Sequence, residues 1–483
     1  MNPARPRVGQ GAEPLVQREQ PVADLLIRGA HVVDPRAGID ARHDVLVRAG
    51  MVAELGDPGS LEAPDGAEVL EGEGRHLFPG FVDPHVHLRV PGQEHKEDLD
   101  SGTRAAASGG FVAIVAMPNT DPVVDDATVL RSLREAARRE ARIPVGFLAS
   151  ITRGLAGEAL TPMAELSDAG ALGFTDDGRP VHRAAILRKA LQYQRLCGGV
   201  LALHEEDPSL SGAGVMHEGE VSARLGLAGI PSISESTMIA RDAAIAGYEG
   251  GRIHIQHLSA RESVAAVAEA KARGVERSGD EREARGRISA EVSPHHLTLT
   301  HEAILRAPNA QAGEAGRGGG SGLDTRLKVN PPLRSHDDRR ALLDGLRDGT
   351  IDCIATDHAP HAREEKEVPF EEAPMGTTGL ETCFAAVYTE LVVPGVLPLG
   401  LVVEKLSAGA ALMGLTPPRI AIGRPAAMCL VDLASEWQVG EAGYESRAEN
   451  CCFAGRTLRG RVLATLAAGA VVYRDRAFAL APA

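Results

Sequence analysis

The chain of 483 residues is poor in aromatic side chains and carries an excess of negative charge. Aromatic residues make up 3% of it, with a single Trp, so its core must be built mainly from aliphatic side chains. A net charge of -15 disfavours a surface that binds nucleic acid or docks on anionic lipid. We therefore expect no nucleic-acid and no membrane partner. The net charge does not exclude a locally basic pocket that binds an anionic small molecule.

Cysteine motifs and long apolar runs are also missing. The six cysteines show no Cys-x-x-Cys spacing, and adjacent Cys451 and Cys452 make an improbable structural disulfide. The sequence has no run of eighteen apolar residues and no charged-then-apolar leader at its start. These features predict a reduced, cytoplasmic protein with buried thiols.

The composition divides the chain into parts. Residues 1–21 are rich in Pro, Gly, Gln and charge, which predicts a mobile tail. Short strand-like pieces between glycine-bearing turns follow in residues 22–76 and return in residues 416–483. Since chain ends often lie close together, we expect both stretches to build one small β-sandwich domain around an insert at 77–415.

In this insert, eight apolar strand candidates alternate with amphipathic helical stretches. The candidates begin at Phe81 and continue at 111–117, 144–149, 171–174, 200–203, 253–255, 288–292 and 351–355. Such alternation predicts a parallel sheet, and eight units predict a (β/α)8 TIM-type barrel of the α/β class. The charged segment 275–287 and the glycine-rich segment 307–323 interrupt the pattern and are typical of surface loops.

A His-x-His pair follows the first strand candidate. Side chains two residues apart in an extended segment share a face, so His85 and His87 can point to one place. Two imidazoles so arranged are half of a zinc site. The pair alone does not decide, because many such pairs bind no metal.

The other strand ends test this hypothesis, because catalytic groups in such barrels come from the carboxyl ends of the strands. Six of the eight strand candidates are followed by His or Asp. The polar residues at the strand ends are His85, His87, Asn119, Asp176, Asp177, His204, His257, His295, His296, Asp357, His358 and His361. Each could singly be a turn residue, a buried histidine or a helix cap, and we assign no role to His295 and His296. Their coincidence on one rim predicts a metal site.

The donor types indicate which metal and which chemistry. Four histidines and two aspartates suit two divalent ions that share a carboxylate or hydroxide bridge. Imidazole and carboxylate without thiolate favour zinc in an open hydrolytic site. Zinc would lower the pKa of a bridging water and polarise a carbonyl oxygen, and Asp357 could shuttle the proton.

Six motifs together resemble the amidohydrolase superfamily and, within it, the bacterial type I dihydroorotases. They are Gly80-Phe-Val-Asp-Pro-His-Val-His-Leu-Arg89, Met117-Pro-Asn-Thr120, Phe174-Thr-Asp-Asp-Gly178, Glu291-Val-Ser-Pro-His-His296, Asn330-Pro-Pro-Leu-Arg334 and Ala355-Thr-Asp-His-Ala-Pro-His361. The likeness extends from about residue 25 to the C-terminus and departs from the family in the tail and in the two insertions.

The resemblance implies a ligand set and a substrate site. His85, His87 and Asp357 would bind one zinc ion, His204 and His257 the other, and Asp177 would bridge them where hydantoinase-like relatives carry a carboxylated lysine. The resemblance further implies a substrate-binding set of Arg89, Asn119 and His361 at the substrate carboxylate, with Asn330, Met375 and Gly376 at the ring. An arginine suits that place, because its planar fork matches a carboxylate.

The activity that this resemblance implies is the reversible zinc-dependent cyclisation of N-carbamoyl-L-aspartate to L-dihydroorotate in pyrimidine biosynthesis. A hydantoinase or allantoinase is one alternative, which Asp177, Arg89 and Asn119 disfavour. A non-catalytic scaffold for aspartate carbamoyltransferase is another, although no ligand has been lost here. We expect a homo-oligomer, with aspartate carbamoyltransferase as a candidate partner.

Overall fold

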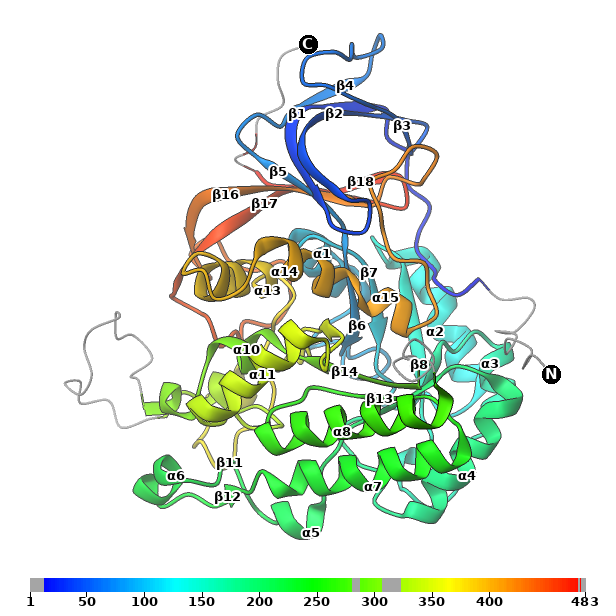
Figure 1. Cartoon of the computed structure of the whole chain (residues 1–483), viewed down its shortest axis with the longest axis vertical. Helices are drawn as coiled ribbons and strands as arrows, with labels where there is room; N and C mark the ends of the chain where they lie inside the picture. The colour runs from blue at the N-terminus through cyan, green and yellow to red at the C-terminus, as the bar shows by residue number, and fades with distance from the viewer. Residues whose placement is uncertain (1–12, 280–286, 306–322, 477, 479–483) are drawn as a thin grey trace.

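Eight parallel strands form a barrel in the centre of the molecule (Figure 1). The computed structural model describes residues 13–279, 287–305, 323–476 and 478. The strands are β6 (Phe81–Val86), β7 (Phe111–Ala116), β8 (Val145–Ala149), β9 (Gly173–Thr175), β10 (Val200–Leu203), β13 (Ile253–Ile255), β14 (Ile288–Val292) and β15 (Cys353–Ile354). They lie in chain order, and a parallel bridge between Val86 and His358 joins the first strand to the segment that follows the last. The predicted (β/α)8 barrel is confirmed.

Helices cover the outside of the barrel because each carries one apolar face. In α2, for example, Asp126 caps the first turn by accepting from the Thr128 and Val129 amides, and Leu130 and Leu133 face inward. The longer helices are α1 (Leu99–Ser108), α2 (Ala127–Glu140), α4 (Ala184–Cys197), α7 (Ile233–Glu249), α8 (Arg261–Ser278), α11 (His336–Asp348) and α14 (Leu399–Ser407). The helix α8 takes up the first residues of the segment 275–287 that was predicted to be a loop.

Shorter elements connect these units. They are α3 (Met163–Asp168), α5 (Pro208–Ser211), α6 (Glu220–Leu225), α10 (Pro294–Thr298), α12 (Arg363–Lys366), α13 (Cys383–Val387), α15 (Gly409–Leu412) and the ribbon of β11 (Met216–His217) with β12 (Gly229–Ile230). The predicted glycine-rich loop lies outside the described residues except for Leu323. Among the described helices, none combines the length and the apolarity needed to span a lipid bilayer.

Strands from both ends of the chain build one β domain, as predicted. They are β1 (Leu25–Asp34), β2 (Ile39–Arg48), β3 (Met51–Gly56), β4 (Glu68–Glu71), β5 (His76–Pro79), β16 (Met428–Gln438), β17 (Thr457–Ala467) and β18 (Ala470–Arg474). They form a single hydrogen-bonded sheet that bends around its own apolar core (Figure 1). The two halves meet where β5 pairs with both β1 and β16. We therefore place the change of domain at Gly80, between β5 and β6.

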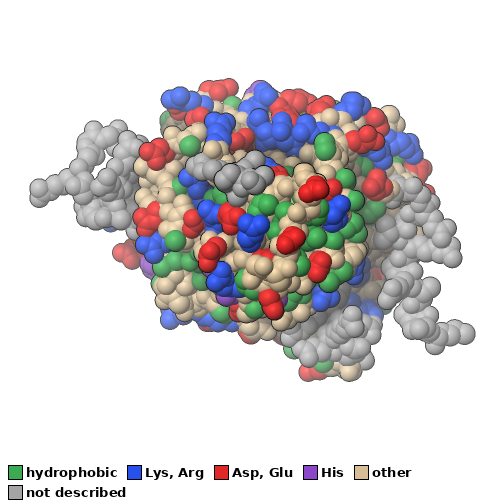
Figure 2. Space-filling model, turned by 90° about the horizontal axis from the view of Figure 1, so that it is seen from above, with side chains coloured by type: hydrophobic (Ala, Val, Ile, Leu, Met, Phe, Trp, Pro, Cys, Tyr) green, Lys and Arg blue, Asp and Glu red, His purple; other side chains and the backbone are tan. Residues whose placement is uncertain are grey.

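The surface of this β domain carries both signs of charge. Seen from that end of the molecule, Lys and Arg side chains lie interspersed with Asp and Glu (Figure 2). The negative net charge of the chain is therefore not gathered into one patch on this face.

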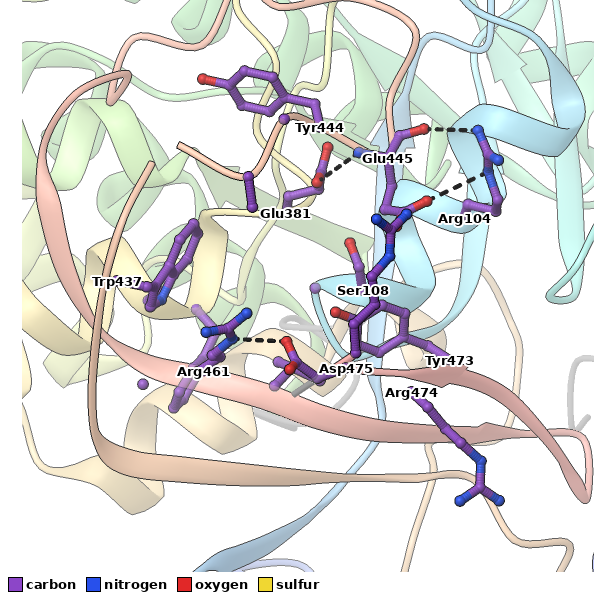
Figure 3. A pocket seen from close by; sticks show the side chains of 18 of the residues that line it. Arg104, Ser108, Glu381, Trp437, Tyr444, Glu445, Arg461, Tyr473, Arg474 and Asp475 are labelled. Atoms are coloured by element: carbon purple, nitrogen blue, oxygen red, sulfur yellow. Dashed lines mark hydrogen bonds and ion pairs between the residues drawn. The ribbon is translucent and has the colours of Figure 1, made fainter. Parts of the chain in front are cut away.

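A cavity of about 570 Å³ lies where the β domain meets the barrel (Figure 3). Its walls come from α1, α13, the strands β16–β18 and the loop after β16. Ion pairs cross it, between Arg461 and Asp475 at 2.7 Å and between Arg104 and Glu445 at 3.6 Å. None of its lining residues is a predicted site residue, so this cavity belongs to the domain contact.

The predicted mobile tail needs a correction. Residues 1–12 lie outside the described residues, but Val16 is buried and exchanges two backbone hydrogen bonds with Val145 of β8 at 3.0 and 2.8 Å. The composition of residues 1–21 as a whole conceals the apolar pair Leu15 and Val16, which packs on the barrel.

We expect Val16→Ala to lower the free energy of unfolding by about 1–3 kcal/mol, because it removes buried methyl groups. Val22, which is 60% exposed, provides the matched control, and Val22→Ala should change stability by less than about 0.5 kcal/mol. Urea unfolding of both variants measures the difference. Equal stabilities would show that the tail does not contribute to the fold.

Candidate metal centre and active site

The six predicted metal ligands come together at the carboxyl end of the barrel. Asp177, which follows β9, lies in their middle. Its Oδ1 is 3.6 Å from His85 Nε2, 3.6 Å from His204 Nδ1 and 3.7 Å from His257 Nε2. Its Oδ2 is 3.4 Å from His87 Nε2. One carboxylate thus faces all four imidazoles, which is the arrangement expected of a bridging ligand.

A second carboxylate completes one half of the cluster. Asp357 Oδ1 lies 3.5 Å from His85 Nε2 and 3.4 Å from His87 Nε2. In the other half, His204 Nδ1 lies 2.9 Å from His257 Nε2. Three of the histidines therefore face the carboxylates with their Nε2 atoms, and His204 faces them with its Nδ1 atom.

These separations fit divalent cations. Ligand atoms about 2.1 Å from a tetrahedral ion lie about 3.4 Å from one another. The donor atoms of His85, His87 and Asp357 lie within 4.8 Å of one another, as do those of His85, Asp177 and His257. His85 Nε2 is buried and has no hydrogen-bond partner within the described parts of the chain. A buried ring nitrogen that faces two carboxylates and has no hydrogen-bond partner is a position that a metal ion can occupy.

The electrostatics of the cluster point the same way. Burial would raise the pKa of Asp177, but the charge on His85 and hydrogen bonds from His204 and His257 hold it well below its usual value. Burial likewise opposes the charge on His204, yet hydrogen bonds to Asp177 and Glu206 raise its pKa to about 10. Such opposed shifts, clustered in one cleft, are typical of functional sites.

Three site residues adopt strained backbone conformations. Arg89, His257 and Asp357 have φ angles of 60°, 31° and 49°, in the left-handed region that non-glycine residues rarely occupy. Strain of this kind collects at active sites, where the surrounding structure holds it in place.

Two of the predicted substrate residues connect to the ligands, Asn119 directly and Asn330 through Glu206. Asn119 accepts through Oδ1 from His87 Nδ1 at 2.9 Å and donates through Nδ2 to Asp177 Oδ2 at 3.2 Å. Asn330 donates to Glu206 at 2.7 Å, and Glu206 lies 3.3 Å from His204 Nε2. Both amides therefore support the ligands as well as facing the site.

The remaining substrate residues gather around His361. Its Nε2 lies 2.9 Å from the carbonyl oxygen of Met375, and a Cβ on Gly376 would approach that nitrogen to 2.9 Å. Arg89 donates through Nε to the carbonyl of Pro360 at 3.0 Å, which leaves its terminal nitrogens for another partner. Burial and the charge of Arg89 lower the pKa of His361 to about 3, so this imidazole is neutral near pH 7.

Sequence reasoning gave no role to several buried acids behind the ligands. Asp83 accepts from the His85 amide at 3.0 Å and from the Thr356 hydroxyl at 2.5 Å. Glu291 lies 2.6 Å from His85 Nδ1. The sequence did contain a signal for both residues. Each is an acid within an otherwise apolar strand, at a position whose side chain points into the barrel.

Comparisons with known proteins identify the family. A family profile described as Dihydro-orotase-like matches residues 74–263. A dihydroorotase of Pelotomaculum thermopropionicum is 45% identical over 453 residues, 94% of this chain and 99% of that protein. The chain belongs to the dihydroorotase family. A second family member, from Anaeromyxobacter dehalogenans, is 44% identical over 93% of this chain and 98% of its own length.

Solved structures agree on the fold of this dihydroorotase family member. An L-hydantoinase from Arthrobacter aurescens has a TM-score of 0.78 at 23% identity, covering 94% of this chain and 96% of its own. A D-hydantoinase from a Bacillus species has a TM-score of 0.75 at 24% identity, with the same coverage of both chains. These structures share the barrel fold, and the dihydroorotase relatives at 44–45% identity carry the family assignment.

Proposed function

We propose that this enzyme interconverts N-carbamoyl-L-aspartate and L-dihydroorotate at the strand-end cluster, with two zinc ions as cofactor. His85, His87 and Asp357 would hold one ion, His204 and His257 the other, and Asp177 both. The observation that carries the proposal is the convergence of all four imidazoles on Asp177, in a chain 45% identical to a dihydroorotase.

Bound zinc would supply Lewis acidity towards the ring carbonyl and towards water. The protein would supply the proton transfers and the orientation. In ring opening, Asp357 takes a proton from the attacking water and delivers it to the departing ring nitrogen. Its place beside His85 and His87, with 12% of its side chain exposed, leaves it open to the substrate.

The substrate carboxylate would lie against Arg89, with Asn119 and His361 beside it. The guanidinium can donate two parallel hydrogen bonds to a carboxylate. His361 would lie beside it as a wall of the site, because the one N–H of the neutral ring is donated from Nε2 to the Met375 carbonyl. Asn330 and the backbone at Met375 and Gly376 would face the ring. The hydrogen bond from Arg89 Nε to Pro360 fixes the direction of the fork before substrate arrives.

The test is to measure both reaction directions on the purified enzyme, with hydantoin and allantoin as control substrates. Closure converts a carboxylate into a ring carbonyl and consumes a proton, so its equilibrium should shift about tenfold towards the ring for each pH unit lowered. The enzyme should run closure in mild acid and opening in base. Equal or faster turnover of hydantoin or allantoin would contradict the substrate while leaving the metal centre intact.

Arg89→Lys should impair both directions, chiefly by raising KM, because a point charge replaces a two-pronged donor. The matched control is Arg153→Lys. Arg153 begins the turn Arg153–Leu155 that follows β8, and it is not one of the predicted site residues. Unchanged KM in Arg89→Lys would remove Arg89 from the substrate site.

The same cluster disfavours the scaffold alternative, since a non-catalytic homologue has no use for a complete ligand set. A homo-oligomer, and an association with aspartate carbamoyltransferase, remain part of the proposal. Light scattering of the chain with and without the transferase tests both.

A further inference from the structure

Glu291 lies behind the metal ligands, inside the barrel, and is 1% exposed. It comes from β14 and is separated from the site by the His85 ring. Its Oε1 is 2.6 Å from His85 Nδ1, and its Oε2 is 2.9 Å from His254 Nε2. Both oxygens of this buried carboxylate therefore accept from imidazole rings, of which only His85 is a proposed ligand.

His254 continues the chain of contacts away from the site. It lies on β13, fully buried, and its Nδ1 is 2.9 Å from the hydroxyl of Ser289. The Nε2–H of His254 is donated to Glu291, and the Ser289 hydroxyl contacts the other ring nitrogen. His254 therefore holds the carboxylate in one orientation.

The same carboxylate reaches the second half of the cluster through the backbone. Glu291 Oε1 also accepts from the amide of His257 at 3.3 Å, and the Glu291 carbonyl accepts from the Leu258 amide at 2.9 Å. His257 has the strained φ angle of 31°. One side chain thus contacts a ligand ring of the first half and the backbone of a ligand of the second.

A further metal ion is the competing interpretation of this cluster, because donor atoms of His254, Glu291 and Cys353 lie within 4.8 Å of one another. The contacts disfavour it. Both carboxylate oxygens and both ring nitrogens already have hydrogen-bond partners. A metal would require the Cys353 thiolate, whereas burial keeps the pKa of that thiol well above its usual value.

We propose that Glu291 is a positioning residue that fixes His85 in the Nδ1–H tautomer and ties the two halves of the metal centre together, with His254 and Ser289 holding its carboxylate. The inference rests on the proposed function, because it takes His85 and His257 as metal ligands. Carboxylates in this position orient the ring of a ligand and raise its basicity.

The test compares Glu291→Gln with Asp176→Asn. The glutamine amide has one acceptor oxygen and cannot accept from both rings. The zinc dissociation constant of the Glu291→Gln variant should therefore rise about 10–100-fold. Asp176 is also buried and adjacent to a ligand, but within the described residues its side chain accepts hydrogen bonds from Ile151 and Thr152 alone. Asp176→Asn should therefore leave zinc affinity unchanged, whatever it does to stability.

A second readout is the tautomer of His85, observed by ¹⁵N NMR of the metal-free protein with labelled histidine. The spectra are recorded at a pH high enough for the ring to be neutral, because burial lowers the pKa of His85 but Glu291, Asp177 and Asp357 together raise it above its usual value. Wild type and Asp176→Asn should show Nδ1–H at His85, and Glu291→Gln a mixture. If Glu291→Gln does not fold, Ser289→Ala and His254→Asn provide the same comparison with smaller shifts. Zinc affinity and tautomer that stay at wild-type values in the folded variants would overturn the proposal.

Two other outcomes are separable. A wild-type protein that binds no divalent metal would contradict the proposed function itself. A metal count that falls by one in His254→Asn, with the His85 tautomer unchanged, would overturn the positioning role in favour of a further metal ion.

Discussion

Asp177→Asn is expected to lose zinc from at least one half of the centre and to reduce turnover by at least about 10³-fold. Asp177 is the side chain that faces all four imidazoles, at 3.4 to 3.7 Å. An amide nitrogen in place of one oxygen is a donor and cannot bind a cation. Metal polarisation of a carbonyl stabilises the transition state by several kcal/mol, and each 1.36 kcal/mol is a factor of ten in rate.

Metal analysis of the purified variant, with rates in both directions, checks this result. Asp176→Asn is again the control, because it makes the same chemical change one residue away and should keep both zinc and rate. A full complement of zinc and a wild-type rate in Asp177→Asn would rule out the bridging role.

Asp357→Asn is expected to slow turnover by roughly 10²–10⁴-fold, the range for loss of a general acid–base group. The asparagine retains an oxygen that can face His85 and His87, so part of the zinc should stay bound. KM should change little, since the substrate carboxylate is held by Arg89. A loss in kcat with KM preserved therefore separates proton transfer from substrate binding.

The control for this variant is Asp352→Asn, at the opposite end of the same strand. Asp352 accepts from Lys271 at 2.7 Å and from the Ala290 amide, away from every proposed ligand. Its variant should lose stability and keep kcat. Near-normal turnover in Asp357→Asn would instead remove Asp357 from the chemistry.

Much of this barrel could be predicted from local pattern. The candidates at 200–203, 253–255 and 288–292 coincide with β10, β13 and β14, because a buried parallel strand is a short apolar run between polar ends. The rim residues were visible for the same reason, since each ligand lies in the last residues of a strand or within three residues after it. Once the eight strands form a barrel, their carboxyl ends meet at one rim, so the clustering of these residues follows from the fold.

The supporting contacts could not be predicted in this way. Asp83 accepts from Thr356, and Glu291 from His85, so each pair joins residues more than 200 positions apart. Which strand interiors face one another depends on the register of the closed barrel. Asn119 shows the same limit, because its sequence context suggested a substrate contact and gave no sign of its hydrogen bond to His87.

The pairing of β5 with β16 has a consequence for how the protein is made. Pro79 lies beside Met428 in that sheet, so one partner leaves the ribosome some 350 residues before the other, about 20 to 70 seconds at ordinary rates of synthesis. Throughout that interval β5 presents an open edge, the kind of surface on which nascent chains associate. The barrel can form as it emerges, but the β domain can close only after synthesis is nearly complete. Loss of the final strands would therefore leave an aggregation-prone nascent chain rather than a smaller enzyme.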